Sequence, residues 1–201
     1  VEFSADRVPE NTLPAEMVDP HDRAKAREYI HGAYAAILSG NTSAFLMNIA
    51  MLRDMTYAYD VDYAEAVFEW FGDFERGINS IRASMQGFST EKGKYKLTEA
   101  EYKVLKKAKE LLEAVGYSLD DIEGGNIVQK LLDGYEKGEH VEISKKDANR
   151  VMQFMTQMED KILPSDSKQE VLAAQLEATN KKRDALFDSI LPSASRSAYG
   201  Q

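Results

Sequence analysis

The chain has no cysteine among its 201 residues. Disulfides, thiolate metal sites and cysteine catalysis are therefore excluded, and we expect either a cytosolic protein or one exported without oxidative folding. Histidine is nearly as scarce, with three residues, none of them in a motif typical of nucleophilic catalysis. No apolar run approaches the roughly 20 residues that a membrane-spanning helix needs. We therefore expect no transmembrane span.

Positive charge is also in short supply. Lys and Arg number 25 against 34 Asp and Glu, which gives a formal net charge of −9. This balance argues against a nucleic-acid partner, which requires a basic face, and against adsorption to anionic lipid. Hydrophobic residues make up 43% of the chain, enough for a core, and the length suits one domain or one domain with a small insertion.

The most prominent pattern is a coiled-coil seam between residues 42 and 88, where apolar or small residues recur at alternating gaps of four and three. The seam consists of Phe45, Ile49, Leu52, Thr56, Tyr59, Tyr63, Ala66 and Trp70. The phase then shifts by four residues, as in a stutter, and continues to Phe88 without a proline. The pattern predicts one helix about 70 Å long. A helix of that length needs a partner of similar length, or the protein is elongated.

A second long helical arm is predicted at the C-terminal end. Pro164 interrupts the helical pattern, and a capping-box sequence at Ser167 to Glu170 restarts it. The seam of this last helix consists of Leu172, Leu176, Thr179, Arg183, Leu186 and Ile190. Because the two arms have similar lengths, we expect them to pair as an antiparallel coiled-coil stalk. The predicted fold class is mainly α, with a small inserted segment between the arms.

The chain is predicted to divide into five parts. These are a flexible N-terminal arm (1–18), the N-terminal helix and long coiled-coil helix (19–88), an inserted head segment (89–146), the C-terminal coiled-coil arm (147–191) and a polar tail (192–201). Asp19 is the expected N-cap of the first helix, and Gly40 lies in the expected break before the long helix. In the head segment, Thr98 opens a capping box. Residues 95–97 and 140–143 are short segments in which apolar and polar residues alternate, and they are predicted to pair as a two-stranded ribbon.

Candidate chemistry is sparse. Glu28 and His31 have the Glu-x-x-His spacing of di-iron helical bundles, but the chain has no second such pair. The carboxylate pairs Glu65/Glu69 and Asp60/Asp62 fit an exposed helix face better than an acid/base site. We therefore expect no catalytic residue, no metal and no cofactor. The dense aromatic residues between 57 and 74 indicate a helix packed on more than one side or, alternatively, a self-association surface.

Residues 148–190 resemble the terminal helix of bacterial type III secretion needle-tip proteins and of the related filament-type translocator proteins. Three features carry the resemblance: the start at Ser167 to Glu170, an Asn-Lys-Lys-Arg patch at 180–183, and the apolar group that follows it. Pro164 and the tail beyond Pro192 depart from the family pattern.

The resemblance implies a secreted, non-enzymatic structural protein at the needle tip or in a filament on the bacterial surface. Its partners would be the needle subunit and the pore-forming translocator proteins, and it would form homo-oligomers. Two other classes stay open. One is a cytosolic helical adaptor or secretion chaperone, and the other is a helical-bundle enzyme or metal protein that uses Glu28 and His31. Secretion into the culture medium would separate the first class from the second, and bound metal would indicate the third.

Overall fold

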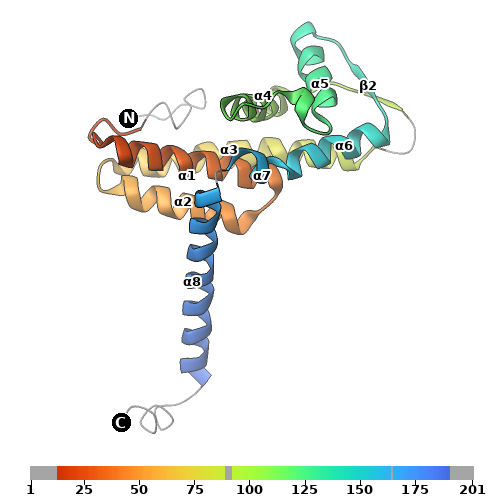
Figure 1. Ribbon diagram of the computed structural model, residues 1–201. Coiled ribbons are helices and arrows are strands. Elements are labelled where there is room, and N and C mark those ends of the chain that lie inside the picture. The colour runs from red at the N-terminus through yellow and green to blue at the C-terminus, as the bar shows by residue number, and fades with distance from the viewer. Residues whose placement is uncertain (1–12, 89–91, 164, 191–201) are drawn as a thin grey trace, which may run out of the picture.

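The computed structural model describes residues 13–88, 92–163 and 165–190. These residues form a helical body from which one helix projects (Figure 1), and the expected mainly α class is confirmed. The only sheet among them is a ribbon of two short strands. Within these ranges, no helix is both long and apolar enough to cross a membrane.

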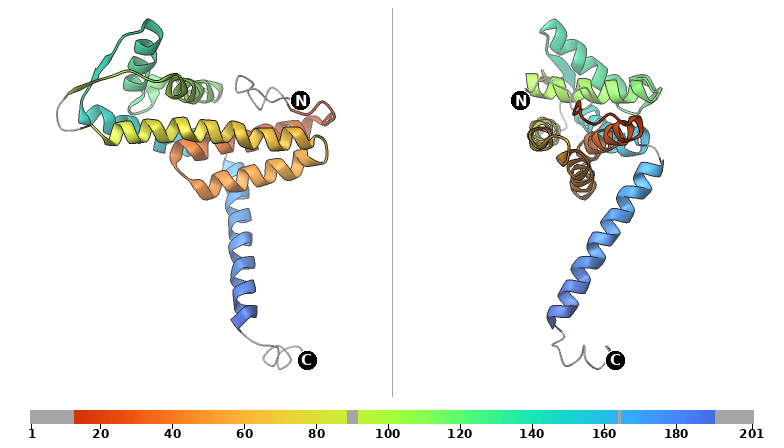
Figure 2. Two further views of the ribbon diagram at one scale, coloured as in Figure 1. Left: turned by 180° about the vertical axis from the view of Figure 1, so that it is seen from behind. Right: turned by 90° about the vertical axis from the view of Figure 1, so that its left-hand side faces the viewer.

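Three helices, α1 (Pro20–Ser39), α2 (Thr42–Tyr57) and α3 (Val61–Gln86), lie alongside one another and form the base of the body (Figures 1 and 2). Their starts follow local chemistry. The Asp19 carboxylate accepts a hydrogen bond from the His21 amide, which caps α1, and Pro20 occupies its first turn. Gly40 ends α1 with φ of 76°, a left-handed conformation that favours glycine. The predicted N-cap and break are both confirmed.

The single helix predicted for residues 42–88 is wrong, because the chain turns between α2 and α3. The backbone amides of Tyr59 and Asp60 both donate to the Thr56 carbonyl, and the Asp60 carboxylate accepts from the Tyr63 amide to start α3. These bonds satisfy the ends of two helices where one continuous helix was expected. The seam therefore folds into two shorter helices that pack on each other.

The middle segment contains β1 (Gly93–Tyr95), α4 (Glu99–Ala114), the 3₁₀ turn η2 (Leu119–Asp121), α5 (Gly125–Lys137) and β2 (Val141–Ile143). The strands pair antiparallel, which confirms the predicted ribbon, although β1 begins two residues before the expected position. The capping box at Thr98 is present. Helix α4 packs on α3 closely enough that a Cβ on Gly77 would lie 2.7 Å from a Val104 methyl carbon.

Helices α6 (Lys145–Thr156) and α7 (Met158–Ile162) return the chain to α1, where the Ser39 hydroxyl accepts from the Glu159 amide at 3.0 Å. Helix α8 (Ser165–Ile190) then leaves the body, and both views show it extending away from α1–α3 (Figure 2). Because α8 begins at Ser165, before the capping box predicted at Ser167 to Glu170, Glu170 lies inside the helix and not at its start. The antiparallel stalk predicted from the two arms is not formed within the chain, because α2 and α3 pack in the body while α8 points outward.

A side chain of α3 stabilises the C-terminal end of α1. The Arg82 guanidinium donates to the carbonyls of Ile37 (3.0 Å) and Leu38 (2.6 Å). Burial lowers the pKa of Arg82 from its ordinary value. Arg82 therefore adds donors at the C-terminal end of α1, where the Ile37 carbonyl also accepts from the Gly40 amide.

The segment before α1 is anchored in its described part. Leu13 and Met17 are buried in the core, and the Arg23 side chain donates to the carbonyls of Pro14 and Met17. Of the predicted N-terminal arm, residues 1–12 lie outside the described ranges. The predicted polar tail (192–201) does so entirely.

Candidate functional site

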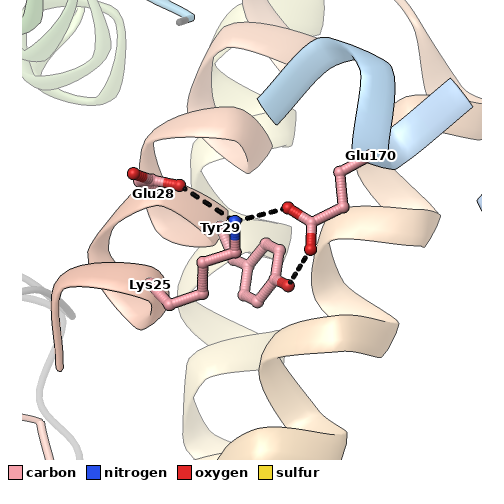
Figure 3. A network of polar contacts seen from close by, with 4 residues as sticks. All are labelled: Lys25, Glu28, Tyr29 and Glu170. Carbon is pink, nitrogen blue, oxygen red and sulfur yellow. Dashed lines mark hydrogen bonds and ion pairs between the residues drawn. The ribbon is translucent and has the colours of Figure 1, made fainter. Parts of the chain in front are cut away.

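The base of the projecting helix is fastened to α1 by a small polar network (Figure 3). The Lys25 ammonium forms an ion pair with Glu170 Oε2 at 2.5 Å, and the Tyr29 hydroxyl donates to Glu170 Oε1 at 3.1 Å. Lys25 also contacts the Glu28 carboxylate at 3.4 Å. All four side chains therefore converge where α8 leaves the body.

This network shifts the pKa values of two of its side chains, Lys25 and Tyr29. The hydrogen bond from Lys25 to Glu170 raises the pKa of Lys25, against a smaller opposing effect of burial. Burial, followed by the hydrogen bond to Glu170, raises the pKa of the Tyr29 hydroxyl. Sequence reasoning missed this junction. Glu170 was assigned to a capping box, and no periodic signal links it to residues more than 140 positions away.

Helix α8 has two distinct faces. One adjoins the body: Val171 is buried, and Ala174 and Ala178 are half-buried, where α8 contacts α2 and α1. At about 100° per residue, the predicted seam lies about 130° around the helix from that face. Residues 181–190 are all exposed. The body therefore covers a side of α8 other than the one that carries its leucines.

The seam of α8 is solvent-exposed along its length. Leu172, Leu176, Leu186 and Ile190 are each 61–66% exposed, and Thr179 and Arg183 between them are also exposed. Phe187 flanks the seam and is 61% exposed. Monomeric soluble proteins expose scattered apolar side chains, but an ordered row at coiled-coil spacing is typical of an interaction surface.

The other predicted seam residues serve the interior of the body. Phe45, Ile49 and Leu52 of α2 and Tyr63 of α3 are buried in the core. Tyr59 lies exposed in the turn between α2 and α3. Trp70 is half-buried, and its indole nitrogen donates to the Tyr34 hydroxyl at 2.5 Å. The structure therefore does not bring these residues together with the seam of α8.

The sequence predicts Glu101 as part of the capping box at Thr98, but not that its carboxylate is buried. Glu101 is 1% exposed, and its Oε2 accepts hydrogen bonds from the hydroxyls of Tyr95 (2.5 Å) and Ser80 (3.1 Å). Its Oε1 accepts from the Thr98 amide at 2.9 Å. Both oxygens are therefore occupied by donors of the body. The arrangement ties β1, α3 and the start of α4 together and leaves no face for a substrate, as expected of a structural acid.

The Glu28 and His31 pair does not gather further ligands. Within the described ranges, no group of three or more His, Asp and Glu side chains is placed to hold a metal ion. Glu28 instead belongs to the network at the base of α8.

Comparisons with protein-family models, with curated proteins and with solved structures find no match to this chain. Among the described residues, the exposed apolar seam of α8 is therefore the feature that bears most directly on function.

Proposed function

We propose that the protein is a non-enzymatic assembly protein that binds a partner helix along α8. The observation that carries this proposal is the row of four apolar side chains, each 61–66% exposed, at the spacing of a coiled-coil seam. A helix that packs one face on its own body and leaves a second apolar face in water favours association with another helix. The fastened base supports the same role, because it restricts the direction in which α8 presents that face.

The finer proposal is a secreted subunit of a type III secretion needle tip or filament that supports translocon assembly on host membranes. It rests on the sequence resemblance of residues 148–190, a segment that includes the whole of α8. Its partners would be the needle subunit, the pore-forming translocators and like subunits. Because no helix among the described residues pairs with α8 along its length, the coiled coil would form between subunits.

A cytosolic helical adaptor or secretion chaperone is the second candidate, and the same observation supports it. An exposed apolar row on a projecting helix also suits the amphipathic helix of a client protein. The two candidates differ in where the protein accumulates.

The test follows the protein in its source organism after induction of secretion. On the secreted-subunit proposal, it accumulates in the medium of the wild-type strain and stays inside cells that lack the secretion ATPase, while a cytosolic marker stays inside both. Retention in the cells of both strains would overturn that proposal in favour of the adaptor. The variant Leu186→Glu is expected to be secreted but to lose translocation or haemolysis. Its matched control, Ala185→Glu, places the same charge on another face of α8 and is expected to retain both.

A further inference from the structure

The seam of α8 has the same spacing and the same order of apolar and polar residues in both directions along the helix. Its six positions are separated by gaps of 4, 3, 4, 3 and 4 residues. Its chemistry is arranged in the same way: two apolar residues at each end, Leu172 and Leu176 at one and Leu186 and Ile190 at the other, and two polar residues in the middle. A helix with a seam of this symmetry is complementary to a second copy of itself that runs in the opposite direction.

We infer that two copies of the chain associate through α8 as an antiparallel two-stranded coiled coil. Leu172 then packs against Ile190 of the second copy, Leu176 against its Leu186, and Thr179 against its Arg183. Each pair occurs twice across the two-fold axis, as a symmetric dimer requires. The inference rests on the proposed role of α8 as the binding surface, and it names a second copy of this chain as the partner.

Charge selects the antiparallel direction. In a parallel pair, Arg183 would face Arg183 of the second copy inside the seam, and two like charges there repel each other and resist desolvation. In the antiparallel pair, Arg183 faces a hydroxyl instead. The Thr179 hydroxyl donates to the Gln175 carbonyl at 2.9 Å, which leaves its oxygen free to accept from the guanidinium.

The residues beside the seam agree with this direction. In an antiparallel pair, Phe187 lies beside Ala173 of the second copy, so that a large side chain covers a small one. In a parallel pair, Phe187 would lie beside Lys182. The antiparallel pair does bring Lys182 near its own symmetry mate, but at the edge of the seam, where both ammonium groups reach water. Added salt should therefore strengthen the dimer.

The shape of the molecule leaves room for the pair. The body adjoins only the N-terminal half of α8, on a face about 130° from the seam. The antiparallel register places the two bodies at opposite ends of the paired helices. A parallel pair would place both bodies side by side at the same end, because each body lies at the N-terminal end of its α8 (Figure 1).

The absence of cysteine allows a direct test of direction by crosslinking in the full chain. Two single variants, Leu172→Cys and Ile190→Cys, are prepared with tags of different mass and oxidised separately and as a mixture. The antiparallel pair predicts a disulfide between the two different chains in the mixture and little product from either variant alone. Strong crosslinking of each variant with itself would show a parallel pair and overturn the inference.

Light scattering tests the association itself. Wild-type protein at about 100 µM, a concentration that saturates micromolar binding, should have twice the monomer mass. Leu186→Glu should raise the dimer Kd on the order of tenfold or more, because it places a carboxylate in the seam, while Ala185→Glu should leave the dimer intact. A monomeric wild-type protein, or equal effects of the two variants, would overturn the inference. A monomer that is still secreted and active in translocation would leave the proposed function standing with another partner.

Discussion

Glu170 on α8 accepts a hydrogen bond from the hydroxyl of Tyr29 on α1, at 3.1 Å and across 141 positions of sequence. Together with the ion pair between Lys25 and Glu170, this hydrogen bond links the projecting helix to the body. The direction in which α8 leaves the body therefore depends on a junction of a few side chains.

Substitution of Glu170 should loosen that junction without unfolding the body. Glu170→Gln removes the ion pair, and we expect a loss of about 0.5 kcal/mol in the free energy of unfolding, since partly exposed pairs contribute little. Hydrogen exchange in the first turns of α8 should accelerate, while exchange in α1 stays slow. The control is Glu177→Gln, which removes the Lys181 pair within α8. Equal exchange in the two variants would show that the junction does not hold the helix.

Tyr95 should make stability fall at high pH. Burial, and then the hydrogen bond to Glu101, raises the pKa of its hydroxyl above the ordinary value of 10.0. Because the pKa of Tyr95 is higher in the folded than in the unfolded state, its protonated hydroxyl stabilises the fold fully at pH values below the unfolded-state pKa. This stabilisation is lost progressively as the pH rises from the unfolded-state pKa towards the folded-state pKa. Tyr95→Phe should lower the free energy of unfolding by about 1.5–3 kcal/mol at neutral pH, because the carboxylate loses a donor.

Urea titrations of wild type and Tyr95→Phe at a series of pH values would measure this effect. The difference between them should shrink above pH 10, since only the wild type has this hydroxyl to lose. A difference that stays constant between neutral pH and pH 11 would contradict the assignment.

Two glycines should respond oppositely to alanine. At Gly32, a Cβ would collide with the buried Asn48 side chain, 2.8 Å from its Cγ, so Gly32→Ala should lower the free energy of unfolding by about 1–3 kcal/mol. At Gly72, the nearest atom is an Arg76 guanidinium nitrogen at 3.7 Å, so Gly72→Ala should raise it by about 0.4–1 kcal/mol. Thermal unfolding followed by circular dichroism would measure both. A tolerated alanine at residue 32 would show that α1 and α2 can separate slightly.

Arg183 should control both the strength and the direction of self-association. Arg183→Leu keeps the monomer fold, because the side chain is exposed and supports no core contact. It replaces the polar layer of the proposed seam by an apolar one and should lower the dimer Kd on the order of tenfold, since a polar residue in a seam costs stability but fixes register. Leu172→Cys in this background should begin to crosslink with itself. Unchanged mass and crosslinking would remove Arg183 from the seam.

Local signals predicted much of the fold. The caps at Asp19 and Thr98 and the break at Gly40 are all present, because each depends on a few neighbouring residues. The ribbon was also visible as short alternating strands.

The turn between α2 and α3 left one local signal, the N-cap residue Asp60, and the hydrophobic periodicity outweighed it. The alternating gaps run through Thr56, Tyr59 and Tyr63 without interruption, and the turn lacks glycine and proline. Its cause is the competition of the Asp60 carboxylate for the amide of Tyr63, which periodicity does not weigh. The seam of α8 was visible in the sequence, but its partner was not. The same apolar spacing occurs in helices that pack in a protein core and in helices that pack against another chain.

The side chain of Arg82 has a consequence for the order in which the chain can fold during synthesis. It supplies donors to the last carbonyls of α1, yet it lies 44 and 45 positions further along the chain. When Ile37 and Leu38 leave the ribosome, Arg82 is still 45 and 44 residues behind them, and at 5–20 residues per second it follows only after about 2–9 s. During that interval the end of α1 must rely on Gly40 and water. The first helical pair of the body therefore waits for the third helix before it is complete.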